Sequence, residues 1–392
     1  MLGDRLRQMR SAQGLTLREL AAKMEEVKVT KQALSQFEHG TAKPRPTVLV
    51  AIASALGTRP ARLLEEPDVK VDLTGWRKRS RFGKQKQERI ESLSRKVLEQ
   101  RVRLQRLLCQ ENGSSLPVHG LPVTGLDDAE DAAENMSKRW HLGCAPIANL
   151  VDVLETHFVH VIELDSNRDF DGVSAVVRDK YGRVVAAGIV TRRGIPAERQ
   201  RLSLAHELGH IVLKVDASVD KESAAFRFGG AFLAPREVLR STVGCRRECI
   251  TDEELKLLKN RFGMSRQALL HRMNDLEIIT DRYYAWWCRE INVRGWKHKE
   301  PDESAPELAW WLPQTVQRAF AEGLISRDDA KDLLGVQLDV KMPASLVARQ
   351  ALLALSVEER RRRLEKQAEK ATPYTEEEYA DCQEFEEDEP VE

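Results

Sequence analysis

The sequence predicts an α+β protein that is mostly helical. Apolar residues recur at helical spacing through most of the chain, which indicates amphipathic helices. Three short β-rich runs lie between residues 159 and 190, and a Tyr181-Gly182 turn separates the last two, so a small antiparallel sheet is predicted. With 392 residues, the chain is long enough for about two or three domains.

The first helices are expected in residues 2–66, which should form a bundle of five. Thr16 can cap the second helix, because Glu19 three residues later completes a capping box. Thr30 can cap the third helix, which should run to Glu38. The caps therefore predict two consecutive short helices with a turn between them.

The third helix is expected to turn polar side chains outward. Two helices joined by a short turn, the second showing amide and basic side chains, form the pattern of a helix-turn-helix. Gln can pair with adenine and Lys with guanine in the major groove. A small protein-binding bundle with a solvated polar face is the alternative. The predicted DNA-binding residues are Lys31, Gln32 and Gln36 for bases, the outward-facing Ser35, and Thr30, His39 and Thr41 for phosphates.

Two stretches of this segment resemble the Cro/CI-type (Xre) repressor domain. LTLRELAAKM is similar to its second helix, and VTKQALSQFEHG is similar to its recognition helix and the turn that follows. The resemblance implies binding to a double-stranded DNA operator, with a homodimer on two half-sites as the expected assembly. The chain departs from the pattern at Glu25-Glu26-Val27-Lys28, where the turn between the two helices is longer than usual.

The segment after the bundle is basic. Residues 71–110 hold 12 Lys and Arg against 4 Asp and Glu. A one-sided apolar stripe predicts a helix from about Lys84 to Gln110. This helix is expected to form a dimer contact or to pack on the next domain. Its cations can contact DNA phosphates, although a solvated helix face is the commoner meaning of such a run.

The run His206-Glu207-Leu208-Gly209-His210 has the spacing of a helical metal site. Two His residues four positions apart lie on one face of a helix, so both imidazoles can reach one metal. Glu207 can then meet a water on the metal without being a ligand itself. Gly209 is costly inside a helix, which suggests that another element passes close to it. A chance match on a buried core helix is the alternative.

A catalytic zinc site needs a third protein ligand. Residues 221–235 show Ala and Phe at helical spacing, and Glu222 stands in the first turn of that predicted helix. A helix packed across the first one can aim Glu222 at the metal. Spacing alone favours a carboxylate placed there by the helix dipole. Asp216 and Asp220 in the connecting loop are rival ligands.

The pair HELGH and ExxAxxFGxxFLAP resembles the ImmA/IrrE family of metallo-endopeptidases. The resemblance implies a zincin-like peptidase domain with one Zn²⁺ per chain, Mn²⁺ being an alternative metal. It makes His206, His210 and Glu222 the metal ligands and Glu207 the general base. Gly229 departs from the pattern, since the family usually has Ala there. The likeness covers most of residues 119–335 and is specific at the metal motif alone.

The resemblance also implies a protein substrate. This would be another regulator, a repressor or an antitoxin, that is cut in response to stress or to a cue from a mobile element. Peptidases often hold a substrate as an extra strand on the edge of a sheet. We expect the strand over residues 183–190 to lie nearest the zinc.

Composition predicts a cytoplasmic protein with no membrane partner. The 6 Cys are scattered, the first residues lack the apolar core of a signal peptide, and no apolar run is long enough to span a bilayer. The last 20 residues, which hold 10 Asp and Glu and no Lys or Arg, are expected to be disordered. The expected domains are a helix-turn-helix domain over 1–67, a basic linker helix over 68–118, a metallopeptidase domain over 119–300, a helical subdomain over 301–345, and a charged helix with the acidic tail over 346–392.

Together these features predict a DNA-binding transcriptional regulator fused to a zinc-dependent endopeptidase. One alternative is a transcription factor whose zinc domain senses or stabilises without proteolysis. Another is a repressor or antitoxin that uses both domains only for binding. An intact Glu207 argues against full loss of proteolysis, because a purely structural zinc site needs no base at that position.

Overall fold

The computed structural model describes residues 2–24, 27–65, 68–78, 83–108, 116–165 and 170–334. Its contacts divide the chain into one unit over Met1–Leu312 and a second over Pro313–Glu392. The two units are described separately. The predicted charged helix and acidic tail over 346–392 lie outside the described residues.

The N-terminal segment forms the predicted bundle of five helices around one apolar core. Thr16 makes both halves of the capping box with Glu19, and the Thr30 hydroxyl accepts a hydrogen bond from the amide of Ala33. Part of the unusual turn, residues 25 and 26, lies outside the described residues. The helices are α1 (Leu2–Ala12), α2 (Leu17–Lys23), α3 (Lys31–Glu38), α4 (Pro46–Ala55) and α5 (Pro60–Leu64).

The main sheet has four strands in the order β1-β4-β5-β3. The prediction of an antiparallel sheet is wrong in one respect, since β3 pairs with β5 in parallel. The chain reverses twice between these two neighbours, so they run in the same direction. The predicted hairpin at Tyr181-Gly182 is confirmed, because β4 and β5 pair antiparallel across it. The strands are β1 (Val69–Lys78), β3 (Val159–Leu164), β4 (Phe170–Asp179) and β5 (Val184–Arg192).

Strand β1 comes from the segment predicted to be only a linker. It pairs antiparallel with β4 along nearly its whole length. Val69 and Val71 are buried against the sheet core, while the alternate residues Lys70 and Asp72 are more exposed. This period-two alternation is that of a half-buried strand. The basic linker helix therefore begins after a strand, at Lys84.

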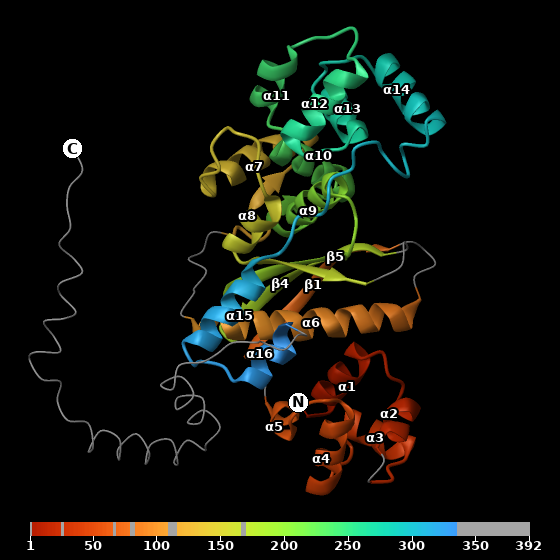
Figure 1. Cartoon of the computed structure of the whole chain (residues 1–392), viewed down its shortest axis with the longest axis vertical. Coiled ribbons are helices and arrows are strands. Elements are labelled where there is room, and N and C mark those ends of the chain that lie inside the picture. The colour runs from red at the N-terminus through yellow and green to blue at the C-terminus, as the bar shows by residue number, and fades with distance from the viewer. Residues whose placement is uncertain are drawn as a thin grey trace, which may run out of the picture. The chain divides into compact units, whose positions relative to one another are not determined.

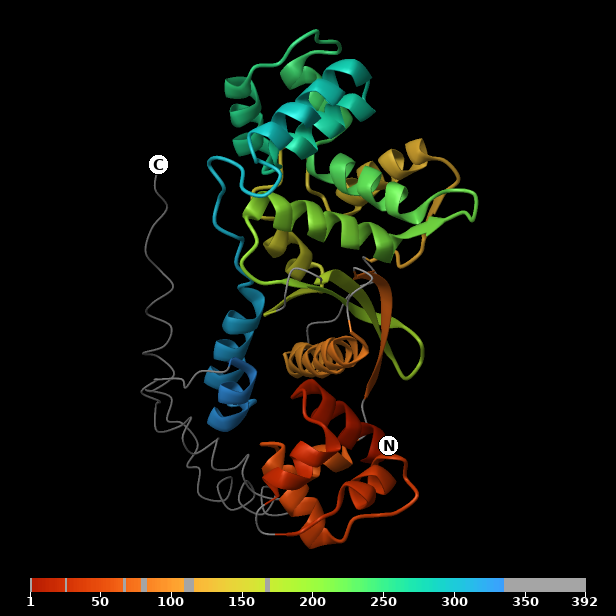
Figure 2. The same cartoon turned by 90° about the vertical axis from the view of Figure 1, so that its right-hand side faces the viewer.

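Helices cover both faces of this sheet (Figure 1). On one face, α9 (Ala197–Val212) packs on β4 and β5. On the other face lies α6 (Lys84–Leu107), whose Leu98 and Val102 join an apolar cluster with Val173 and Val190. Figure 2 shows α6 under the sheet and β1 at its side. The predicted packing of the basic helix on the next domain is thus observed.

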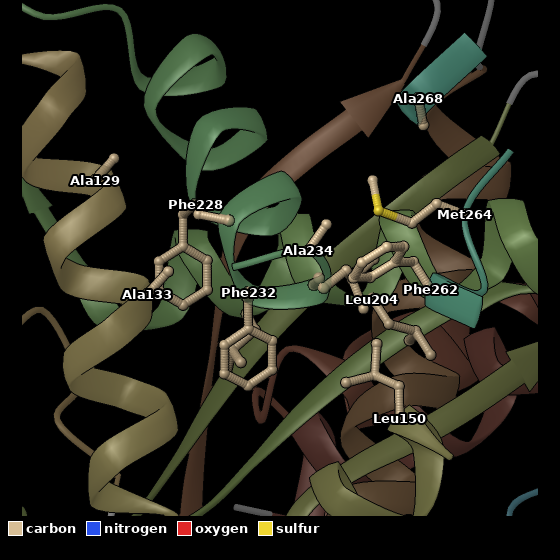
Figure 3. Packing of buried hydrophobic residues seen from close by; sticks show 14 of the residues in the cluster. Ala129, Ala133, Leu150, Leu204, Phe228, Phe232, Ala234, Phe262, Met264 and Ala268 are labelled. Atoms are coloured by element: carbon tan, nitrogen blue, oxygen red, sulfur yellow. The ribbon is translucent and has the colours of Figure 1, made fainter. Parts of the chain in front are cut away.

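The other helices of the first unit surround α9 in one large apolar core. In Figure 3, Phe228 and Phe232 of α10 lie between the small residues of α7 and the rest of this core. A two-stranded parallel sheet, β2 (Leu121–Val123) with β6 (Leu213–Val215), accompanies them. These helices are α7 (Leu126–Arg139), α8 (Leu150–Thr156), α10 (Lys221–Leu233), α11 (Arg236–Val243), α12 (Asp252–Phe262), α13 (Arg266–Asp275) and α14 (Asp281–Val293).

The segment over 301–312 is bound to α9, although it was assigned to the next subdomain. Gln200 accepts a hydrogen bond from the amide of Glu307, and the Glu307 carboxylate pairs with Arg201 at 2.5 Å. The described part of the second unit contains two helices, α15 (Trp311–Ala321) and α16 (Arg327–Leu334). The first two residues of α15 belong to the first unit. Among the described residues, no helix combines the length and apolar character that a bilayer crossing requires.

Candidate metal centre and nucleic-acid interface

Helix α9 brings the two His residues of the motif together. Its length from Ala197 to Val212 includes the whole motif, and most of its residues are buried between the sheet and α10. The Nε2 atoms of His206 and His210 lie 2.9 Å apart. One turn of helix therefore aims both ring nitrogens at a single point, as the spacing predicts.

Glu222 completes the cluster from α10. Asp220 caps this helix by accepting a hydrogen bond from the amide of Ser223, which fixes the first turn where Glu222 stands. The Glu222 carboxylate lies 3.4 Å from Nε2 of His206 and 3.2 Å from Nε2 of His210. The rival Asp216 is bonded instead to Ser218 in the loop.

The donor geometry fits a tetrahedral metal. Donors about 2.0–2.1 Å from a tetrahedral zinc lie about 3.4 Å from one another. The two Nε2 atoms here are 2.9 Å apart, and the Glu222 carboxylate lies 3.4 Å from that of His206 through Oε2 and 3.2 Å from that of His210 through Oε1. Among the described residues, His206, His210 and Glu222 form the one cluster of this kind. Two imidazoles and a carboxylate also match the donor set of catalytic zinc in peptidases.

Glycines let the two ligand-bearing helices approach closely. A Cβ added at Gly209 of α9 would lie 3.2 Å from Cα of Ala225 in α10. A Cβ added at Gly229 of α10 would lie 3.0 Å from the amide nitrogen of His206. The expectation that another element passes close to Gly209 is therefore confirmed, and Gly229 has a steric reason to depart from Ala.

Glu207 is buried on the face of α9 that meets the sheet. Its side chain accepts a hydrogen bond of 2.6 Å from the Ser174 hydroxyl of β4. A Cβ at Gly172, two residues earlier in β4, would lie 3.1 Å from Oε1 of Glu207. The Glu207 carboxylate thus accepts a hydrogen bond from the Ser174 hydroxyl and packs against β4 where Gly172 has no side chain.

These contacts correct one prediction about the sheet. The strand over 183–190 was expected nearest the metal, but it became β5, an interior strand. Strand β4 contacts Glu207 through Ser174 and Gly172. Both β4 and β5 are interior strands, and it is β4 whose alternate residues Gly172 and Ser174 meet Glu207 of α9.

An aromatic ring and a pocket adjoin the candidate metal cluster. The ring of Phe226 lies 4.2 Å from that of His206, between centroids. Phe226 also lines a pocket of about 310 Å³ that extends to α13 and α14. In this pocket Asp275 hydrogen-bonds His271 and raises the pKa of its imidazole, while burial raises the pKa of the Tyr284 phenol. The pocket is therefore amphipathic.

Helix α3 presents the predicted DNA-reading side chains. Lys31, Gln32 and Gln36 are exposed, while Leu34 is fully buried in the bundle core. Two of the residues predicted to contact phosphates make local hydrogen bonds to the backbone. Nδ1 of His39 lies 2.7 Å from the Ser35 carbonyl, and the Thr41 hydroxyl donates to the Gln36 carbonyl. Thr30 serves as the helix cap. Contact of these residues with DNA stays a prediction.

Family models match two segments of the chain. Residues 1–66 match a helix-turn-helix domain, and residues 172–274 match an IrrE N-terminal-like domain of the peptidase class. The chain therefore carries one segment similar to a helix-turn-helix domain and another similar to an IrrE N-terminal-like domain. Both resemblances drawn from the sequence are thereby confirmed. No curated protein and no solved structure matches the chain.

The IrrE-like segment contains the whole candidate centre. It starts at Gly172 beside Glu207, passes through β4, β5, α9 and α10, and ends in α13. Ser174, Gly172 and Phe226 are the contacts that sequence reasoning missed. A single hydroxyl in the otherwise apolar run Val173-Ser174-Ala175-Val176-Val177 was the available signal for Ser174.

Proposed function

We propose that the chain is a DNA-binding regulator whose IrrE-like domain is a zinc-dependent endopeptidase. The observation that carries this proposal is the combination of a three-donor cluster with Glu207, which is buried next to it and held by Ser174. A structural zinc site would need no such base. The domain division given by the sequence, with the peptidase over 119–300, is part of the same proposal, with strand β1 and residues 301–312 added because they contact this range.

In the proposed reaction, His206, His210 and Glu222 hold one Zn²⁺ or, alternatively, Mn²⁺. The bound metal supplies a Lewis acid that polarises the peptide carbonyl and lowers the pKa of water. Glu207 accepts the proton of the attacking water and later returns it to the leaving amine. Ser174 keeps the carboxylate of Glu207 in position for both transfers through its 2.6 Å hydrogen bond.

The helix-turn-helix domain would bind an operator in double-stranded DNA. Lys31, Gln32 and Gln36 would read bases from α3, because their side chains are exposed on the helix that the family uses for recognition. Ser35, Thr30, His39 and Thr41 would contact the backbone. A homodimer on two half-sites is the assembly that such domains favour.

The proposed substrate is another regulator, a repressor or an antitoxin, cut in a stress or mobile-element response in the cytoplasm. Resemblance to the ImmA/IrrE family supports this choice, together with the DNA-binding domain on the same chain. A peptidase tethered to DNA would act at high local concentration on proteins bound nearby.

The peptidase is tested by mixing the zinc-loaded chain and its Glu207→Gln variant with candidate repressors, with and without a chelator. We expect the wild type to cut one of them, and the variant to keep its zinc but lose cleavage by at least about 100-fold. Equal cutting by both proteins would exclude Glu207 as the base. Zinc binding by both without any cleavage would favour a sensing or structural role.

The DNA-binding assignment is tested by Gln32→Ala. Loss of a bidentate contact with adenine should weaken specific binding by roughly 1–3 kcal/mol and relax the preference at one base position. Selection of binding sites from random DNA, followed by titration of the selected site, measures both effects. Arg18→Ala, on the preceding helix α2, is the matched control. An unchanged sequence preference for Gln32→Ala would exclude α3 as the reading helix.

A further inference from the structure

Strand β1 lies at the sheet edge next to Glu207. In the order β1-β4-β5-β3, β4 would be an edge strand if β1 were absent. β4 carries Ser174 and Gly172, which contact Glu207. The residues of β1 paired with these two are Thr74 and Arg77. The backbone of β1 therefore runs along the part of β4 that contacts Glu207.

The direction of β1 is that of an added strand. It pairs antiparallel with β4, and its residues come from outside the segment that matches the IrrE-like domain, residues 172–274. An extended peptide that binds a protein by strand addition makes the same backbone ladder with an exposed edge. A substrate segment and β1 would thus compete for one set of hydrogen-bonding groups on β4.

Apolar contact anchors the half of β1 that lies far from Glu207, and nearer to it the Thr74 hydroxyl donates a hydrogen bond of 3.4 Å to the Ser174 carbonyl. Val69 and Val71 are buried in the cluster beneath the sheet, so the first half of the strand is anchored by apolar contact. Toward Glu207 the ladder is irregular, with register shifts between Thr74 and Trp76 and again between Arg77 and Lys78. Asp72 meets Arg178 only at 3.9 Å, a surface pair that contributes little.

We propose that β1 is an internal occupant of the substrate strand, so that the peptidase accepts a protein segment only after β1 leaves β4. The occupant that replaces it would be an extended segment of the substrate protein. This inference rests on the proposed peptidase function. It adds that the segment joining the helix-turn-helix domain to α6 controls access to the centre.

The test is an engineered disulfide between β1 and β4, called the lock, which can be formed and then reduced. Lys70 and Arg178 are paired across β1 and β4, and neither touches the proposed centre. Paired residues of antiparallel strands lie within the Cα separation that a disulfide tolerates. Lys70→Cys with Arg178→Cys should therefore fix β1 when oxidised and free it when reduced with a phosphine. The two single-Cys variants, treated in the same way, control for the native cysteines.

The opposite variant, Val71→Ser, should loosen β1 by removing a buried apolar contact. The probe for all proteins is fluorescein-labelled casein, a disordered protein. Its cleavage is measured with the zinc-loaded chain, and its binding is measured by anisotropy in the Glu207→Gln background. We expect the oxidised lock to lower both by at least 10-fold relative to its reduced form, and Val71→Ser to raise both several-fold.

The outcomes separate this proposal from the peptidase itself. If lock and release change casein binding but no form cleaves casein, the strand competition stands, and the peptidase function is decided by the test with candidate repressors. If the oxidised lock binds and cuts as well as the reduced form, the competition is overturned and the peptidase stands. The proposal is also overturned if a folded Val71→Ser protein does not bind casein. It is likewise overturned if the mass of the intact chain shows that the chain cleaves itself after β1.

Discussion

Glu207 and Ser174 come from segments more than thirty positions apart, and they meet at 2.6 Å. A hydrogen bond to a charged group stabilises it by about 1.5–3 kcal/mol. The hydroxyl therefore fixes the position of the carboxylate. In the proposed reaction Ser174 is a positioning residue, since it would act through Glu207.

Ser174→Ala should lower kcat by about 10- to 100-fold and leave KM and zinc content unchanged. Ser174→Thr, which keeps the hydroxyl, should restore part of kcat. The matched control is Ser241→Ala, an exposed serine of α11. The account of Ser174 would be contradicted by an unchanged kcat, or by a loss of zinc that parallels the loss of rate.

At the residue scale, sequence reasoning predicted what the metal motif itself contains. His206, His210, Glu207 and Glu222 all lie in one cluster or beside it, as expected. Helical spacing fixes the first three, because they belong to one helix. Ser174 could not be predicted in the same way, since the contact depends on how a strand packs across the helix.

Among the helices, the close approach of α9 to α10 matters most for the candidate centre. Glu222 reaches the two imidazoles only because the helices touch at Gly209 and Gly229. Another glycine, Gly230, is next to the second of these in α10. A Cβ there would meet only the Arg272 side chain, at an ordinary 3.4 Å. These glycines therefore have different steric roles within one helix pair.

Gly209→Ala should be at least about 1 kcal/mol less stable than Gly230→Ala, although both gain the same helix propensity. The first variant places a methyl group against the backbone of α10, while the second fills ordinary space. Urea unfolding of both proteins measures the difference. Zinc affinity should also fall in Gly209→Ala alone. Equal stabilities would show that α10 yields without cost.

Elements were predictable where periodicity was uninterrupted. The helices of the bundle, α9 and α10 follow from caps and apolar spacing. The parallel pairing of β3 with β5 did not, because sequence order does not reveal which strands are neighbours. Strand β1 was overlooked because the basic residues that follow it were taken to mark a linker, although Val69, Val71 and Leu73 alternate with polar residues.

At the scale of the whole molecule, β1 and α6 tie the two matched segments together. Gln8 of α1 donates a hydrogen bond of 3.0 Å to Glu99 of α6, and Arg5 forms an ion pair with the same carboxylate. α6 in turn covers the sheet on which the candidate metal centre rests. The helix-turn-helix domain therefore contacts α6, on which the sheet is packed. Strand β1, which lies between this domain and α6 in the sequence, is a strand of that sheet.

We propose that Glu207 enables this chain to cleave another DNA-binding regulator. Intact-protein mass spectrometry of cells that express either the wild type or Glu207→Gln, matched for zinc content, tests it most directly. We predict that one DNA-binding regulator is shortened by cleavage only in cells with the intact glutamate. Identical protein masses in the two kinds of cells, under conditions in which both chains are folded and metal-loaded, would contradict the claim.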